Sequence, residues 1–417
     1  MFQYLINKSR YFYMKYLKML ILTAIVFTFI SCGEDCQPVE LAGPMESTIK
    51  IGVILSETGK YNIGANKAAF ELALEEIEAS ITATGSNVNI EYQIADDQSN
   101  PDTCLAIMEK MHEEDSIKIF FGFSSSEILG SVIDYINTNN LFALSISSTS
   151  NAYAIEDNVF RFIPSDKVLA NVYTQTFKLN NINHVIPLVN DMNIACTSLA
   201  TELLSDLDEA GIQHSGGIHY NPYNPNYSAV IDLLRQDLVE NVLPTNTDTT
   251  IAVFMSSTKE YIEIIEEVDE SLLKTVKWYG SDGTYIKELF ESEKAVAFAD
   301  DVNFLVPILA NQPETKDLYI DVNQKISEKA GFASEPYGAI TYDAAKLLLN
   351  VAILCKNADI DVLKEQFVIM SNRTCGATGI SELDEFGDRK FGTFDFNTPE
   401  KVNDEWQWTN IYKVTNR

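Results

Sequence analysis

The chain alternates short apolar runs with longer segments in which apolar residues recur at helical spacing. The runs 49–55 and 117–121 are rich in isoleucine and phenylalanine, as is typical of parallel strands buried on both faces. Between them, Phe70, Ala73 and Ile77 fall on one side of a helical pattern whose other side carries glutamates. This rhythm predicts an α/β fold built from doubly wound parallel sheets.

Two series of such units follow one another, which predicts two domains in a chain of 417 residues. The first series has expected strands at 49–55, 88–94, 117–121 and 141–146. The second has expected strands at 184–189, 212–220, 250–255 and 276–280, and a further strand at 302–309 leads out of it. Helices are expected at 70–77, 104–111, 128–137, 172–177, 199–207, 230–238 and 261–268.

The segment 117–137 is the strongest candidate for function. Its strand ends at Gly122, which permits a sharp turn, and Ser124, Ser125 and Ser126 follow before the next helix. Backbone N–H groups at a helix N-terminus, with hydroxyls nearby, favour a carboxylate or another anion. The alternative interpretation is that these serines only cap the helix.

Residues 1–31 have the pattern of an export signal. Lys15 and Lys18 precede an apolar run at 19–30 that is short for a membrane span. Phe29-Ile-Ser-Cys32 resembles a bacterial lipobox, and this resemblance implies cleavage before Cys32 and lipid attachment to its sulfur. The alternatives are a simple secretory signal, or an N-terminal anchor with an incidental cysteine.

Residues 32–47 are polar and contain two prolines, so we expect a flexible tether there. Met14 is an alternative start, because the basic region that follows it is complete by itself. Together these features predict a protein of the bacterial cell envelope, held by lipid in the periplasm or at the surface.

Charge and motifs exclude several functions. The formal net charge is −30, and a surface this acidic repels phosphate backbones, so we expect no nucleic-acid partner. The histidines and cysteines show no metal-ligand spacing. No Gly-x-Ser-x-Gly elbow, phosphate loop or dinucleotide fingerprint is present, so we expect neither an enzyme nor a cofactor.

Several segments together carry a family likeness. They resemble type I periplasmic binding proteins, above all the Leu/Ile/Val-binding proteins of ABC transporters, and the ligand-binding regions of receptors with the same fold. The likeness covers roughly residues 48–414. The segments are 49–55, 61–64, Ala95-Asp-Asp-Gln-Ser-Asn-Pro101, Phe121-Gly-Phe-Ser-Ser-Ser126, Tyr337-Gly-Ala-Ile-Thr-Tyr-Asp-Ala-Ala345 and 376–389.

The resemblance implies two α/β lobes that close on a ligand around a hinge of three chain crossings. The crossings are expected near residues 160–166, 302–311 and 378–383. Lobe one is then expected at 48–163 and 308–379, and lobe two at 167–303 and 383–417.

The resemblance also implies where lobe one binds a ligand. The carboxylate of an amino-acid ligand is expected at Ser125 and Ser126. A second loop after the fourth strand contributes Ser147, Ser148 and Thr149, although it lacks the family's proline and alanine. The alternative is that this second loop is a serine-rich turn without ligand contact.

In lobe two, the resemblance places Asp282 against the ligand's ammonium group. The alternative is an Asp-Gly turn with its acid in water. Ser256 and Ser257 stand where the family often has an aromatic wall, which implies a more polar pocket and weakens the case for leucine, isoleucine or valine. Tyr61 completes the expected ligand-binding set.

Cys355 and Cys375 flank a short expected helix in an exported chain, where disulfides are permitted, and we predict that they pair. The leading functional hypothesis is a solute-binding lipoprotein that captures an amino acid or related carboxylate for an ABC permease. The alternative is a regulatory lipoprotein of the same fold, such as an envelope sensor or an activator of a cell-wall synthase. A hydrolase or dehydrogenase has no catalytic motif in its favour.

Overall fold

The computed structural model describes residues 47–62, 64–243, 250–268, 272–334, 336–356 and 359–416. The predicted signal segment, Cys32 and nearly all of the tether lie outside these residues. The described residues from 47 to 416 belong to one compact unit.

The first sheet has six parallel strands in the order β14-β5-β4-β3-β1-β2. Neighbouring positions of its strands face opposite sides: Phe120 packs with one group of helices and Phe121 with the other. Its strands are β1(Ser47–Leu55), β2(Val88–Asp96), β3(Ile119–Gly122), β4(Phe142–Ser145), β5(Val159–Pro164) and β14(Asp388–Arg389).

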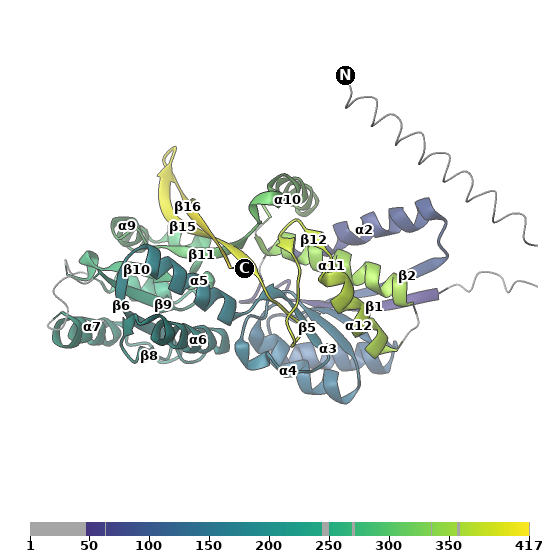
Figure 1. The fold of residues 1–417 in the computed structure, drawn as a ribbon, viewed down its shortest axis with the longest axis horizontal. Helices are drawn as coiled ribbons and strands as arrows, with labels where there is room; N and C mark the ends of the chain where they lie inside the picture. Colours follow the sequence, from purple (N-terminus) through teal and green to yellow (C-terminus); the bar gives the residue numbers. More distant parts are fainter. Residues whose placement is uncertain are drawn as a thin grey trace, which may run out of the picture. The chain divides into compact units, whose positions relative to one another are not determined.

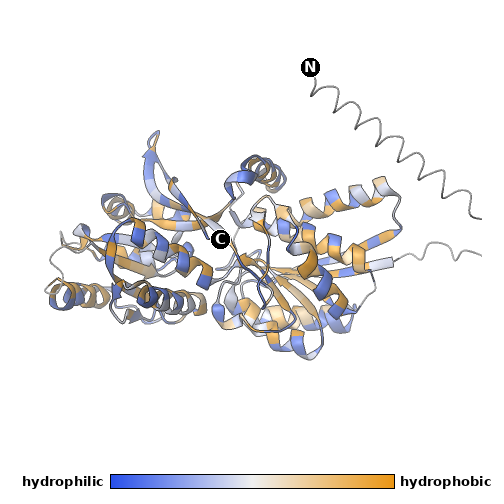
Figure 2. Cartoon of the chain, viewed as in Figure 1, coloured by the Kyte–Doolittle hydropathy of each residue, from blue (hydrophilic) through white to orange (hydrophobic). Residues whose placement is uncertain are grey.

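Helices cover both faces of this sheet, as the apolar strands predicted (Figure 1). α3(Pro101–Glu113) and α4(Ser126–Thr138) pack on the Phe120 side. The opposite side holds α2(Asn66–Thr84), α11(Pro336–Cys355) and α12(Ile360–Ser371), with α10(Lys316–Ala330) beside α2. Figure 2 shows the strands of this sheet as largely hydrophobic.

The second sheet is also parallel, in the order β10-β9-β6-β7, with β8 pairing to β6. The predicted strand 212–220 is two short strands, because the Gly216-Gly217 pair interrupts it and Gly217 adopts φ +95°. Its strands are β6(Ile182–Asn190), β7(Gln213–His214), β8(Ile218–Tyr220), β9(Thr250–Ser256) and β10(Lys277–Gly280). Its helices are α5(Asp166–Leu179), α6(Ile194–Ala210), α7(Tyr227–Asp237), α8(Tyr261–Glu266) and α9(Glu293–Asp301).

A third, antiparallel sheet joins β11(Val306–Ala310) to the long hairpin of β15(Gly392–Val402) and β16(Glu405–Asn416). β14 precedes this hairpin and pairs with β5 of the first sheet, whereas the sequence assigned its residues to lobe two. The lobe boundaries stay a prediction. The remaining elements are β12(Cys375–Gly376), β13(Gly379–Ile380), a π-helical turn η2(Leu238–Val242), and the 3-10 turns η1(Asn151–Tyr153), η3(Leu273–Thr275), η4(Asp282–Thr284), η5(Lys287–Glu291) and η6(Pro313–Thr315).

α11 is the one described helix that is long and apolar enough to cross a membrane. Of its most apolar window, 72% is buried inside the protein, as is typical of a core helix.

The predicted disulfide between Cys355 and Cys375 is wrong. Cys355 ends α11 just before α12, and Cys375 follows the far end of α12. A helix of 12 residues is about 18 Å long, whereas the Cα atoms of a disulfide lie within about 7 Å. The helix therefore separates the two thiols.

Candidate functional site

The hydroxyl-rich turn after β3 is built on a glycine. Gly122 has φ +129°, and a Cβ there would lie 2.0 Å from the Ile54 carbonyl oxygen. The chain then enters α4, whose N-cap is Ser125: its Oγ accepts a hydrogen bond from the Ile128 N–H at 3.1 Å. The capping interpretation thus holds for Ser125. The first N–H groups of a helix still have no partner within the helix, so the turn keeps donors that an anion can use.

The two predicted hydroxyl loops of the first sheet meet at Ser126. Its Oγ accepts the Ser148 hydroxyl at 3.1 Å and the Ser150 N–H at 3.2 Å. Ser147 lies beside them, and its buried Oγ has no hydrogen-bond partner among the described residues. Because buried polar atoms are nearly always satisfied, this hydroxyl is a natural position for a ligand contact.

Asp282 begins η4 directly after β10, where its Oδ1 accepts the Gly283 N–H at 3.0 Å. It is partly accessible, yet surrounding protein raises the pKa of its carboxyl. No ion pair neutralises Asp282 within the part of the chain that the structure describes. It is a negative group that can accept an ammonium ion.

The structure adds Asp166, which the sequence reasoning missed. It opens α5 immediately after β5, is 2% exposed, and its Oδ2 has no hydrogen-bond partner among the described residues. The pKa of Asp166 is raised to about 7: burial is the largest cause, the Asp282 charge adds to the rise, and the Ser198 and Thr149 hydroxyls oppose it. The available signal was an acid directly after a strand, at the first expected chain crossing.

Thr149 connects the first-sheet loop to this carboxylate. Its carbonyl oxygen accepts the Asp166 N–H at 2.8 Å. The second hydroxyl loop therefore meets Asp166, whose pKa the Asp282 charge raises although the two aspartates lie 116 residues apart in the chain.

Ser256 and Ser257 are buried and already bonded within the second-sheet side. The Ser256 hydroxyl donates to the Cys196 carbonyl at 2.8 Å. The Ser257 hydroxyl lies 2.5 Å from the Tyr220 hydroxyl, which in turn donates to Glu260 at 2.9 Å. The sequence did not single out Tyr220 or Glu260, because their proximity depends on loops after different strands.

Tyr61 lies next to the first turn of α4. Its hydroxyl donates to the Glu127 carboxylate, and the Lys60 ammonium lies 4.6 Å from the centre of its ring. Burial and the Glu127 hydrogen bond raise the pKa of Tyr61 to about 12, so it is a neutral donor at physiological pH. Glu127 directly follows Ser126, which places Tyr61 beside the predicted anion position.

The nearby buried cation is already neutralised. The Arg161 guanidinium donates to both oxygens of Asp388 and to the Ser150 carbonyl, and both charged side chains are at most 2% exposed. This pair links β5 to β14, and Arg161 also holds the Ser150 loop by its hydrogen bond to the carbonyl. It leaves Asp166 without a cation of its own, although the Arg161 charge lowers the pKa of Asp166.

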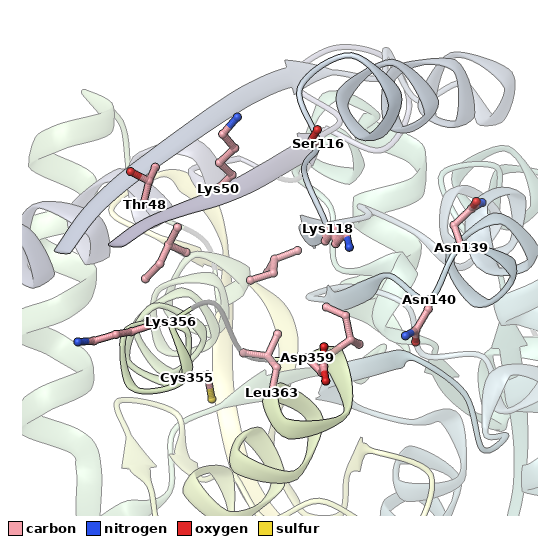
Figure 3. A pocket seen from close by; sticks show the side chains of 13 residues that line it. Thr48, Lys50, Ser116, Lys118, Asn139, Asn140, Cys355, Lys356, Asp359 and Leu363 are labelled. Carbon is pink, nitrogen blue, oxygen red and sulfur yellow. The ribbon is translucent and has the colours of Figure 1, made fainter. Parts of the chain in front are cut away.

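A pocket of about 450 Å³ lies elsewhere, at the amino ends of β1 and β3. Thr48, Lys50 and Lys118 line it together with Lys356 and Asp359 (Figure 3). The predicted ligand residues follow the carboxyl ends of the strands, which is the opposite end of the sheet. Open α/β sheets bind their ligands at that end. This pocket is therefore not the predicted site. Over the described ranges, no cluster of His, Cys, Asp or Glu could hold a metal ion.

Comparisons with known proteins identify the family and the fold. A family model described as periplasmic binding protein matches residues 48–353. No curated protein sequence matches the chain.

Among solved structures, a leucine-binding protein from Thermotoga maritima is 17% identical with a TM-score of 0.70, over 87% of this chain and 97% of its own. A branched-chain amino acid transporter substrate-binding protein from Streptococcus pneumoniae, in complex with isoleucine, is 16% identical with a TM-score of 0.63, over 87% and 100%. An ABC-transporter solute-binding protein from Rhodopseudomonas palustris, in complex with 3,4-dihydroxybenzoic acid, is 16% identical with a TM-score of 0.64, over 88% and 97%. At identities this low, the structural similarity shows a shared fold and nothing more.

Proposed function

Because this chain belongs to the periplasmic binding protein family, we propose that it is an extracytoplasmic solute-binding protein that captures a small amino-acid-like ligand. The ligand would lie between the hydroxyl loops of the first sheet and the aspartates beside the second. In this proposal the protein delivers its ligand to an ABC permease. A lipid on Cys32 attaches it to the membrane.

The observation that carries this proposal is the Oδ2 atom of Asp166, which is buried without a hydrogen-bond partner among the described residues, on a carboxyl whose pKa the Asp282 charge raises. A buried carboxylate oxygen without a partner is costly unless a cation or donor completes it. An ammonium group supplies a positive charge and several N–H donors at once. On the other side, Ser147, Ser125 and the N-terminus of α4 offer donors to a carboxylate.

A molecule that carries both groups on one carbon, an α-amino acid, fits this arrangement best. Two structural neighbours are described in complex with leucine or isoleucine, and a third in complex with an aromatic carboxylic acid. The proposed contacts are Ser125, Ser126, Ser147, Ser148, Thr149, Asp166, Asp282 and Tyr61. Ser256 and Ser257 act indirectly in this proposal, because their hydroxyls hold Cys196 and Tyr220 in place.

A thermal-shift screen of the standard amino acids and small carboxylates tests the proposal, because a tightly bound ligand stabilises the folded state by mass action. Any compound that raises Tm is then titrated by calorimetry into wild type and Asp282→Ala. The substitution is expected to weaken an amino acid by about 3–5 kcal/mol, since it leaves a buried ammonium without its partner.

Asp300→Ala is the matched control, because Asp300 is an exposed acid on α9. It should bind as wild type does. A screen in which no amino acid stabilises the protein, or equal affinities of wild type and Asp282→Ala, would reject the proposal.

A further inference from the structure

We propose that Asn151 is a positioning residue that holds the ligand-binding loop of the first sheet against the second-sheet helix α6. It would thereby set how often the site is closed, without touching the ligand. The biological role of this contact rests on the proposed function, whereas the measurement that tests the contact needs no ligand.

Asn151 makes two hydrogen bonds to α6. Its backbone N–H donates to the Ser198 Oγ at 2.8 Å, and its side-chain amide donates to the Glu202 Oε1 at 2.9 Å. Ser198 and Glu202 are four residues apart on one helix, so they lie on the same face, one turn apart. A single asparagine thus binds α6 at two points, and one acceptor is a carboxylate, which strengthens the bond.

Each end of this contact is firmly attached to its own sheet. On the first-sheet side, the Ser150 N–H next to η1 donates to Ser126. Tyr153 of η1 packs closely against Gly130 of α4, since a Cβ at Gly130 would lie 2.1 Å from its hydroxyl. On the second-sheet side, α6 buries Leu199, Leu203 and Leu207 in the core. The two bonds therefore join the two predicted lobes, and they break if those lobes separate.

The contact is also continuous with the proposed ligand site. The Ser198 hydroxyl that accepts from Asn151 also lies near enough to Asp166 to lower the pKa of its carboxyl. Asn151 itself comes two residues after Thr149, whose carbonyl accepts the Asp166 N–H. Closing around a ligand and forming the Asn151 bonds bring the same elements together, so each favours the other.

A distance measurement in the ligand-free protein tests this directly. Spin labels are placed on Asp134→Cys of α4 and Leu233→Cys of α7, both exposed positions. Cys32, Cys36, Cys355 and Cys375 are changed to serine, while Cys104 and Cys196 are buried and stay. Asn151→Ala and Glu202→Ala are each expected to shift the distance distribution toward longer values, with the ratio of closed to open protein falling roughly tenfold.

A double-mutant cycle separates this role from simple damage. If Asn151 and Glu202 act through one bond, the double variant opens no further than either single variant. Glu209→Ala, an exposed acid near the end of the same helix, should leave the distances unchanged. Unchanged distances in Asn151→Ala, or additive effects in the double variant, would overturn the inference. A ligand screen without any stabilising amino acid would reject the proposed function and still leave this measurement decisive.

Discussion

The loops at the carboxyl ends of the strands fall into two chemical groups. After β3 and β4 of the first sheet come hydroxyls and a helix N-terminus, centred on Ser126 and Ser147. After β5 of the same sheet and β10 of the second sheet come the carboxylates Asp166 and Asp282. Because both sheets are parallel and covered by helices, this difference teaches that the chemistry of the proposed site comes from its loops and not from its sheets.

The same comparison extends to two buried charges at β5. The first sheet pairs Arg161 with Asp388, and both are satisfied. Asp166 has one unsatisfied oxygen and an acid as its charged neighbour. We expect the first arrangement to stabilise the fold, and we propose that a positively charged ligand group completes the second. Four changes test this contrast, and they follow in order of expected effect.

Asp388→Asn should have the largest effect, because it leaves the Arg161 guanidinium buried without its counter-ion. We expect the free energy of unfolding to fall by about 3–5 kcal/mol, as for other broken buried pairs. Urea denaturation measures this. Asp134→Asn, at an exposed position of α4, is the control, and a loss as small as in that variant would show that the pair does not support the fold.

Asp166→Asn should have the opposite effect on stability. The pKa of Asp166 is about 7 in the folded protein, above its usual value, so the folded state holds a proton that the unfolded state has lost. The free energy of unfolding is therefore highest below the ordinary pKa of an aspartate, and it falls as pH rises toward 7. Because asparagine resembles the neutral acid, the variant should be more stable than wild type at pH 8, by on the order of 2–4 kcal/mol.

The check is the difference in unfolding free energy between wild type and Asp166→Asn, measured from pH 4 to pH 8. At pH 4 the two proteins should be similar, and the gap should open with rising pH. Amino-acid binding should be lost in the variant although it is more stable. A difference that does not change with pH would mean that Asp166 is not held protonated.

Ser126→Ala removes the oxygen on which the two hydroxyl loops meet. The buried Ser150 N–H then has no acceptor, so we expect a loss of about 1–3 kcal/mol in stability. Thermal unfolding measures the loss. Ser131→Ala, on the same helix but away from the second loop, should cost less; equal losses would show that the meeting of the loops is not what Ser126 stabilises.

Ser125→Ala should cost about 1 kcal/mol of stability, because it removes the N-cap of α4. Ser125→Asp separates capping from anion binding. Aspartate restores the cap, and with it the stability, but its charge repels a carboxylate. Calorimetry should therefore show weaker amino-acid binding in a protein of normal stability, and unchanged binding would place the ligand carboxylate elsewhere.

Residues close together in the chain were predictable from the sequence. The apolar run of β1, the turn at Gly122 and the cap at Ser125 each depend on neighbours within a few positions. The predictions that failed depended on distant packing. The Cys355–Cys375 pair looked plausible along the chain, but an intervening helix keeps the thiols apart.

The sequence by itself determined the alternation of strands and helices, because apolar period and turn residues act locally. It also placed hydroxyls after β3 and β4, at positions that any parallel sheet brings to one edge. Only the tertiary structure decided that Asp166 lies beside Asp282, that Arg161 is neutralised by a residue 227 positions away, and that Asn151 reaches α6. The physical reason is that the energy of a buried charge depends on every group around it, and those groups are assembled by folding from all parts of the chain.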